Sequence, residues 1–326
     1  MSEVNFSPKS PRWKSLKQKL DNADSNPKLP LLSVAELHNL GSGAFSVGNF
    51  RAHSPLGGEI VVKVAHMDKC KSLEQEVKLT LKLKHPNLRC AVGKMHRGVH
   101  YAYAHFQFVP GYDLFALASE HSPPFPTKAP HRAAKLPTMV GVRSVFRKVL
   151  QALVYLHGLD IVHNDVKPEN IVVHASSLAE VNSDTGVWLM DLGLSFKVAT
   201  QKMRRAGSPM YVAPEKFEEN AIIGLAADIF SMGLTLHAVC SLNAIMSEEH
   251  LEKPDFPKLY IAAVKRLRRN LESDNTSIFA YDAMKEAILV ATSLTPELRP
   301  SAAALLEYPI FSTVDIRLPN GSKSGK

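Results

Sequence analysis

The chain has 326 residues, 45% of them hydrophobic and 21% charged, so it is long enough to bury a sizeable core and to form two lobes. Cys70, Cys90 and Cys240 lie far apart with no CxxC spacing, which argues against a disulfide framework and against a thiolate zinc site. Each of the three is expected to be a small buried hydrophobe. The formal net charge of +8 attracts polyanions in general, but the basic residues are scattered, so no specific nucleic-acid binding is expected.

The N-terminal region has neither the apolar core of a signal peptide nor a charge-free stretch of transmembrane length, and no later segment has one. We therefore expect an intracellular protein without a membrane span, located in the cytoplasm, with the nucleus as an alternative. Residues 1–35 are rich in Pro, Ser, Lys and Asn, which predicts a disordered tail. Trp13, Leu16 and Leu20 have helical spacing that could dock a partner or a membrane, but a mobile tail is the preferred interpretation.

The next segments alternate between strand and helix patterns. Residues 40–65 combine a glycine-rich stretch, a hairpin loop and the β-branched run EIVVKVA, which together predict strands around turns. An amphipathic helix is expected from Ser72 to the His85-Pro86 step, because a residue before proline avoids the helical region. The pattern of a strand returns at residues 100–109, in HYAYAHFQFV.

The C-terminal two thirds have a different character. Five prolines within residues 122–137 exclude a helix or a central strand there, so this segment is a loop or an insertion. Residues 140–159 repeat apolar side chains at intervals of three and four, which predicts a long amphipathic helix. The remainder, to about residue 311, is mainly helical, with short strands near residues 171 and 187.

One loop concentrates groups that suit phosphoryl transfer. Residues 161–170, IVHNDVKPEN, place a proton acceptor (Asp165), a cation (Lys167) and a metal-ligating amide (Asn170) between a helix and a strand. Phosphoryl transfer depends on positioning and on charge neutralisation, which these groups can supply. A second apolar strand ends at Asp191, whose carboxylate could share Mg²⁺ with Asn170, because hard cations prefer oxygen ligands.

Five motifs in order, GSGAFS, IVVK, HNDVKPEN, DLG and APE, make the chain resemble the eukaryotic-type protein kinases over about residues 36–311. The resemblance implies an α+β, bilobal fold. A small β-rich N-lobe with one helix would span residues 36–108, and a larger, mainly α-helical C-lobe would span residues 109–311 and carry the proline-rich insertion. Residues 312–326 would form a C-terminal tail.

The resemblance also assigns residues to nucleotide binding, with ATP as the phosphate donor. Lys63 would hold the α- and β-phosphates, and Glu76 would pair with that lysine. The other nucleotide contacts would lie on the phosphate-covering loop, the adenine-binding hinge, the ribose position and the strand after the catalytic loop: Gly41, Gly43 and Phe45; Gln107 and Val109; Asp113; and Val172.

For catalysis, the resemblance implies that Asp165 is the base that orients the substrate hydroxyl and that Lys167 steadies the γ-phosphate. Ser208 would bridge the two, and Asn170 and Asp191 would hold Mg²⁺. The sequences VKPEN and GSP resemble those of serine/threonine kinases more than those of tyrosine kinases.

Three further matches are structural anchors. Glu215 would pair with a buried Arg299, and Asp228 would brace the catalytic loop from below. Two departures from the family pattern concern regulation: Asn164 replaces the arginine that usually pairs with an activation-segment phosphate, and Arg204 stands where an activating threonine is common. We therefore expect the segment to be ordered without phosphorylation.

The sequence thus predicts a serine/threonine kinase that transfers the γ-phosphate of MgATP to a protein hydroxyl. Singly, Lys63 could be a surface cation, Glu76 an exposed helix charge and Asp191 a turn former, but their joint order outweighs these interpretations. A pseudokinase scaffold remains an alternative, favoured by Ser46 in place of the loop's third glycine. A small-molecule phosphotransferase is a second alternative, opposed by the activation segment that ends in APE. The pattern indicates no oligomeric state.

Overall fold

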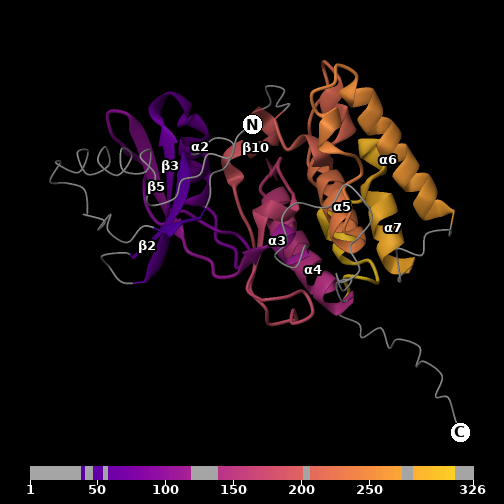
Figure 1. The fold of residues 1–326 in the computed structure, drawn as a ribbon, viewed down its shortest axis with the longest axis horizontal. Helices are drawn as coiled ribbons and strands as arrows, with labels where there is room; N and C mark the ends of the chain where they lie inside the picture. Colours follow the sequence, from indigo (N-terminus) through magenta and orange to yellow (C-terminus); the bar gives the residue numbers. More distant parts are fainter. Residues whose placement is uncertain are drawn as a thin grey trace, which may run out of the picture. The chain divides into compact units, whose positions relative to one another are not determined.

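The computed structural model describes residues 38–40, 47–53, 58–118, 139–200, 206–273 and 282–312. The chain divides into two compact units, one comprising Met1–Pro110 and Met190–Ser195, the other Gly111–Leu189 and Phe196–Lys326 (Figure 1). The tail predicted over residues 1–35, the glycine-rich loop, the insertion at 122–137 and nearly all of the tail at 312–326 lie outside the described residues.

A five-stranded antiparallel sheet forms the first unit. Its strand order is β1-β2-β3-β5-β4, and every neighbouring pair is antiparallel. The strands are β1 (His38–Asn39), β2 (Gly48–His53), β3 (Glu59–His66), β4 (His96–Arg97) and β5 (Tyr101–Gln107). The register places Lys63 of the central strand opposite Asn49 on one side and Ala104 on the other.

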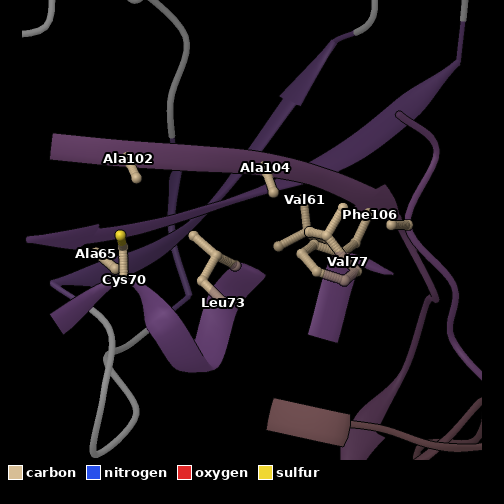
Figure 2. Packing of buried hydrophobic residues seen from close by; sticks show 9 residues of the cluster. Val61, Ala65, Cys70, Leu73, Val77, Ala102, Ala104 and Phe106 are labelled. Carbon is tan, nitrogen blue, oxygen red and sulfur yellow. The ribbon is translucent and has the colours of Figure 1, made fainter. Parts of the chain in front are cut away.

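Helix α2 (Lys71–Thr80) packs against one face of this sheet, after the 3-10 turn η2 (Met67–Lys69). Figure 2 shows Leu73 and Val77, one turn apart on the helix, in the same buried cluster as Val61 and Phe106 of the strands, with Val77 next to these two. The helix ends at Thr80, earlier than predicted, because the N–H groups of Lys82 and Leu83 bond to carbonyls three residues back, as in a 3-10 turn. Leu83, for example, donates to the Thr80 carbonyl at 3.2 Å.

The opposite face of the sheet is also apolar and buried. Its cluster alternates with the first along the strands and comprises Phe50, Ala52, Ile60, Val62 and Val64. Because successive side chains of a strand point to opposite faces, burial of both faces explains why every residue of β3 from Ile60 to Ala65 is buried and why all of them except Lys63 are apolar. All three cysteines are free thiols, and Cys70 lies in the core cluster under α2, as expected for a small hydrophobe.

The second unit is mainly helical. Its described helices are α3 (Leu114–Ala118), α4 (Met139–His157), α5 (Ala226–Ser241), α6 (Phe256–Glu272), α7 (Asp282–Ala291) and α8 (Ala302–Leu306). Helix α5 is buried around almost its whole circumference, and it contacts α4 and α7, while α4 also packs against α8. Two small antiparallel sheets carry the loops between the helices: β6 (Tyr112–Asp113) with β8 (Ile171–Val173) and β9 (Val187–Leu189), and β7 (Ile161–Val162) with β10 (Phe196–Lys197).

This division confirms the predicted α+β fold, with a smaller β-rich region that carries one described helix and a larger helical region. The strands expected near residues 171 and 187 are β8 and β9, and they pair with each other. None of the described helices combines the length and apolar character needed to cross a membrane.

Candidate functional site

Lys63 of β3 and Glu76 of α2 form a buried ion pair in the first unit. The Lys63 Nζ lies 2.8 Å from Glu76 Oε2, and the two residues are only 7% and 1% exposed. The alternatives of a surface cation and an exposed helix charge are therefore wrong. Burial alone lowers the pKa of Lys63, but attraction by the Glu76 and Asp191 carboxylates outweighs it and raises that pKa.

Asp191 brings a second carboxylate to the same lysine. Its Oδ1 lies 2.9 Å from Lys63 Nζ and also accepts from the Gly193 N–H at 3.4 Å. Asp191 has a left-handed backbone with φ of 62°. Aspartate adopts this conformation more readily than most other residues except glycine, because its short side chain can accept a hydrogen bond from the following turn. Burial raises its pKa, but Lys63 outweighs this and lowers it to about 2, so the carboxylate is ionised at neutral pH.

The turn after Asp191 is held by the first turns of α2. Ser72 Oγ donates to the Gly193 carbonyl at 2.9 Å, and the Gln75 amide donates to the Ser195 carbonyl. A Cβ atom at position 193 would lie 2.6 Å from Ser72 Oγ, so only glycine allows this approach. The helix that carries Glu76 thus also fixes the turn that carries Asp191.

Arg89 is a second buried cation beside Glu76, and it was not among the residues predicted from the sequence. Its guanidinium lies 4.0 Å from Glu76 Oε1 and over the Phe106 ring, 5.0 Å from the centroid. Burial raises the pKa of Glu76, and the charges of Lys63 and Arg89 act against that shift. A basic residue in the otherwise apolar run LRCAV was the only sequence signal for it.

In the second unit, Asp228 at the start of α5 holds the backbone of the loop at residues 161–170. Its carboxylate accepts from the N–H groups of His163 and Asn164, both at 2.8 Å, and lies 3.0 Å from His157 Nε2. Burial opposes the charge, but the contacts with His157 and the Asn164 N–H outweigh it and lower the pKa of Asp228. His163 is fully buried, and its Nδ1 accepts from the Asp165 N–H at 3.3 Å.

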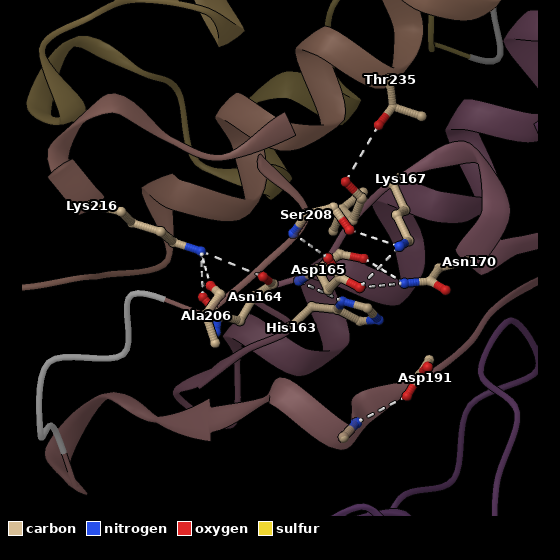
Figure 3. Close-up of polar contacts among 12 residues, drawn as sticks. His163, Asn164, Asp165, Lys167, Asn170, Asp191, Ala206, Ser208, Lys216 and Thr235 are labelled. Atoms are coloured by element: carbon tan, nitrogen blue, oxygen red, sulfur yellow. Dashed lines mark hydrogen bonds and ion pairs between the residues drawn. The ribbon is translucent and has the colours of Figure 1, made fainter. Parts of the chain in front are cut away.

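Asp165 is oriented from three sides (Figure 3). The Ser208 N–H donates to its Oδ1 at 2.8 Å, and Asn170 Nδ2 donates to its Oδ2 at 2.9 Å and to its carbonyl at 2.8 Å. Lys167 Nζ lies 3.6 Å from Oδ2 and donates to Ser208 Oγ at 2.6 Å. Because the Asn170 nitrogen makes both of its bonds to Asp165, the amide oxygen is the atom left to ligate a cation.

Glu215 and Arg299 pair as the sequence indicated. The two guanidinium nitrogens of Arg299 each donate to one carboxylate oxygen at 2.7 Å, a bidentate geometry that is almost fully buried. This pair joins the 3-10 turn η7 (Pro214–Phe217) to the segment before α8. The residue directly after Glu215, Lys216, is also buried, and sequence reasoning assigned it no role.

The remaining predicted residues lie as follows. Gln107 is the exposed end of β5, and Val109 follows it, half-buried. Asp113 Oδ1 accepts from the Ala116 N–H at 2.8 Å and so caps α3, while Val172 is buried in β8. The predicted phosphate-covering residues Gly41, Gly43 and Phe45 lie outside the described residues.

The comparison with known families is decisive about the class of protein. The model of the protein kinase domain matches residues 34–311. The chain belongs to the protein kinase domain family. That match extends over both units and includes every residue named above for the ion pairs and the catalytic loop.

Curated relatives of the chain are named as serine/threonine-protein kinases. The chain is 30% identical over 285 residues to the serine/threonine-protein kinase DCLK2 of Homo sapiens, covering 84% of this chain and 33% of that protein. It is 29% identical over 302 residues to DCLK2 of Mus musculus, with 89% and 35% covered. It is 27% identical over 274 residues to the serine/threonine-protein kinase CG17528 of Drosophila melanogaster, with 82% and 33% covered. The chain thus spans about a third of the length of these relatives.

Proposed function

We propose that the protein is an ATP-dependent serine/threonine kinase that transfers the γ-phosphate of MgATP to a Ser or Thr hydroxyl of a protein. The observation that carries this proposal is the Asp165 carboxylate, held by Ser208 and Asn170 next to Lys167. The family match and the names of the relatives support the same class of reaction.

In the proposed reaction, Asp165 accepts a hydrogen bond from the substrate hydroxyl and takes its proton as the oxygen attacks the γ-phosphorus. The bond from that phosphorus to the β–γ bridging oxygen breaks, and ADP leaves. Lys167, already within reach of Asp165 and Ser208, neutralises charge on the transferred group. Ser208 fixes both partners, since its N–H bonds the aspartate and its Oγ bonds the lysine.

The nucleotide would be held by the ion-pair group of the first unit. We propose that Lys63 binds the α- and β-phosphates, kept charged by Glu76 and Asp191. Asn170 and Asp191 offer the amide and carboxylate oxygens that Mg²⁺ prefers, and bound Mg²⁺ would neutralise charge developing on the leaving phosphates. No described group of three or more His, Cys, Asp or Glu side chains could hold a metal, but Mg²⁺ at a nucleotide needs only one or two protein ligands.

We also propose that activity does not require phosphorylation of the activation segment. Asn164 takes the position of the arginine that would bind such a phosphate, and it is 2% exposed, with its backbone held by Asp228. The test is activity of protein treated with a phosphatase. Strict dependence on a segment phosphate would contradict this part of the proposal.

The proposed activity is tested by incubating the purified chain with labelled ATP, Mg²⁺ and a generic Ser/Thr acceptor protein, beside the Asp165→Asn variant. We expect label transfer by the wild type alone and nearly equal ATP binding by both proteins. No transfer by either protein, with ATP binding also absent, would favour the pseudokinase scaffold. Equal transfer by both would remove Asp165 from its assigned role.

A further inference from the structure

Lys216 is a buried lysine that the proposed reaction does not use. It is 3% exposed, and its ammonium group reaches back to the residues around Asp165 (Figure 3). Nζ donates to Asn164 Oδ1 at 2.5 Å and to the Ala206 carbonyl at 3.1 Å, and it lies 3.4 Å from the Asn164 carbonyl. An ammonium group has three protons, so three converging oxygens match its capacity to donate.

These oxygens belong to the two chain segments that flank Asp165. Asn164 directly precedes Asp165, and Ala206 lies two residues before Ser208, whose N–H donates to Asp165 at 2.8 Å. Lys216 therefore joins the catalytic loop to the segment that carries Ser208. Without it, the bond from the Ser208 N–H to Asp165 and the bond from Lys167 to Ser208 Oγ would have to align the two segments.

The backbone conformation at Asn164 and Gly207 leaves room for the Lys216 ammonium group. Asn164 has φ of 73° and Gly207 has φ of 136°, both in the region that L side chains seldom adopt. A Cβ atom at position 207 would lie 3.0 Å from the Asn164 carbonyl oxygen and 3.3 Å from Lys216 Nζ. Glycine at 207 thus leaves room for the contact between the lysine and the loop.

The charges around the ammonium group compensate its burial in part. Burial lowers the pKa of Lys216, and the nearby carboxylates of Asp228, Asp165 and Glu215 act against that shift. A buried cation without such partners would be strongly unfavourable. The position is therefore built for a cation in contact with the loop.

We propose, on the basis of the proposed function, that Lys216 is a positioning residue: its ammonium group ties Asn164 to Ala206 and so keeps the Ser208 N–H on Asp165. The ammonium group thereby aligns the catalytic loop with the segment that carries Ser208, and this alignment needs no phosphate on that segment. Lys216 touches neither substrate nor nucleotide in this role. It acts on the reaction through Asp165.

The test compares Lys216→Met, which keeps the length and removes the charge and donors, with Lys253→Met as a matched exposed control. We expect the amide proton of Ser208 to exchange about tenfold faster in Lys216→Met, because one buried tether is lost. We expect kcat to fall about 10- to 100-fold, with KM for ATP within about twofold, since Lys63 and its partners are unchanged. The control should match the wild type in both measurements.

Asn164→Gly gives a second test from the other end of the tether. It removes the Oδ1 acceptor and tolerates the positive φ, so the Ser208 amide proton should exchange faster here too. This variant keeps the proposal testable if Lys216→Met does not fold. A folded Lys216→Met or Asn164→Gly protein with wild-type exchange and kcat would overturn the proposal. If the wild type transfers no phosphate, the proposed function fails, but the exchange measurement still decides whether the tether exists.

Discussion

Replacement of Arg299 by methionine should destabilise the second unit strongly. The Arg299 side chain is fully buried, and Glu215 is only 8% exposed at its side chain. The guanidinium makes two bonds of 2.7 Å to Glu215, one of 2.8 Å to the Ser293 carbonyl and one of 3.0 Å to the Ala226 carbonyl. Methionine would fill much of the space but leave a buried carboxylate and two carbonyls without these donors.

The size of the effect follows from that unpaired charge. Breaking a buried ion pair by removing one partner costs about 3–5 kcal/mol, far more than the same change at an exposed pair. With a urea dependence of about 3 kcal/mol per molar for a protein of this size, the midpoint of unfolding should fall by about 1–2 M. Removing both Arg299 and Glu215 should cost less than the sum of the single changes, because no charge is then left unpaired.

The assay uses the fluorescence of Trp188, which lies on β9 in the same unit. The chain has two tryptophans, so a Trp13→Phe background isolates that signal. Arg266→Met, an exposed arginine on α6, is the matched control and should change stability by no more than about 0.5 kcal/mol. Equal midpoints for Arg299→Met and Arg266→Met would refute the argument that the buried pair holds this region together.

Three further changes test the ion-pair group and the catalytic loop. Lys63→Met leaves Glu76 without its 2.8 Å partner and removes a proposed phosphate ligand. The kcat/KM for label transfer should therefore fall at least about 100-fold. An unchanged kcat/KM would mean that another cation holds the phosphates. Ser208→Ala removes the 2.6 Å acceptor of Lys167 but keeps the N–H on the aspartate, so kcat should fall about tenfold in steady-state assays, and a wild-type kcat would show that the contact is dispensable. The pKa of Asp191 falls from 3.8 to about 2 on folding, so its contribution to stability is complete above about pH 4 and is lost as pH falls towards 2. Calorimetry should find that acid lowers the stability of Asp191→Asn less than that of the wild type. An equal loss of stability in both proteins would contradict the shift.

Much of the fold and of the candidate site could be predicted because their signals are local. The β-branched run of β3, the spacing of Leu73 and Val77 and the short distance in sequence from Asp165 to Asn170 are all properties of neighbouring residues. The position at which α2 ends was predicted less well. The sequence carries an apolar pattern beyond Thr80, but the competition between helical and 3-10 hydrogen bonds at a helix end depends on surrounding contacts.

The sequence by itself determined the order of the motifs, the residues of the catalytic loop and the family to which they point. Only the tertiary structure decided that Arg89 lies beside Glu76 and that Lys216 reaches Asn164, 52 residues earlier in the chain. A lysine or arginine in a sequence has no visible partner, since most such residues are solvated at the surface. Its role is set by which oxygens folding brings within hydrogen-bonding distance, and by whether water is excluded there.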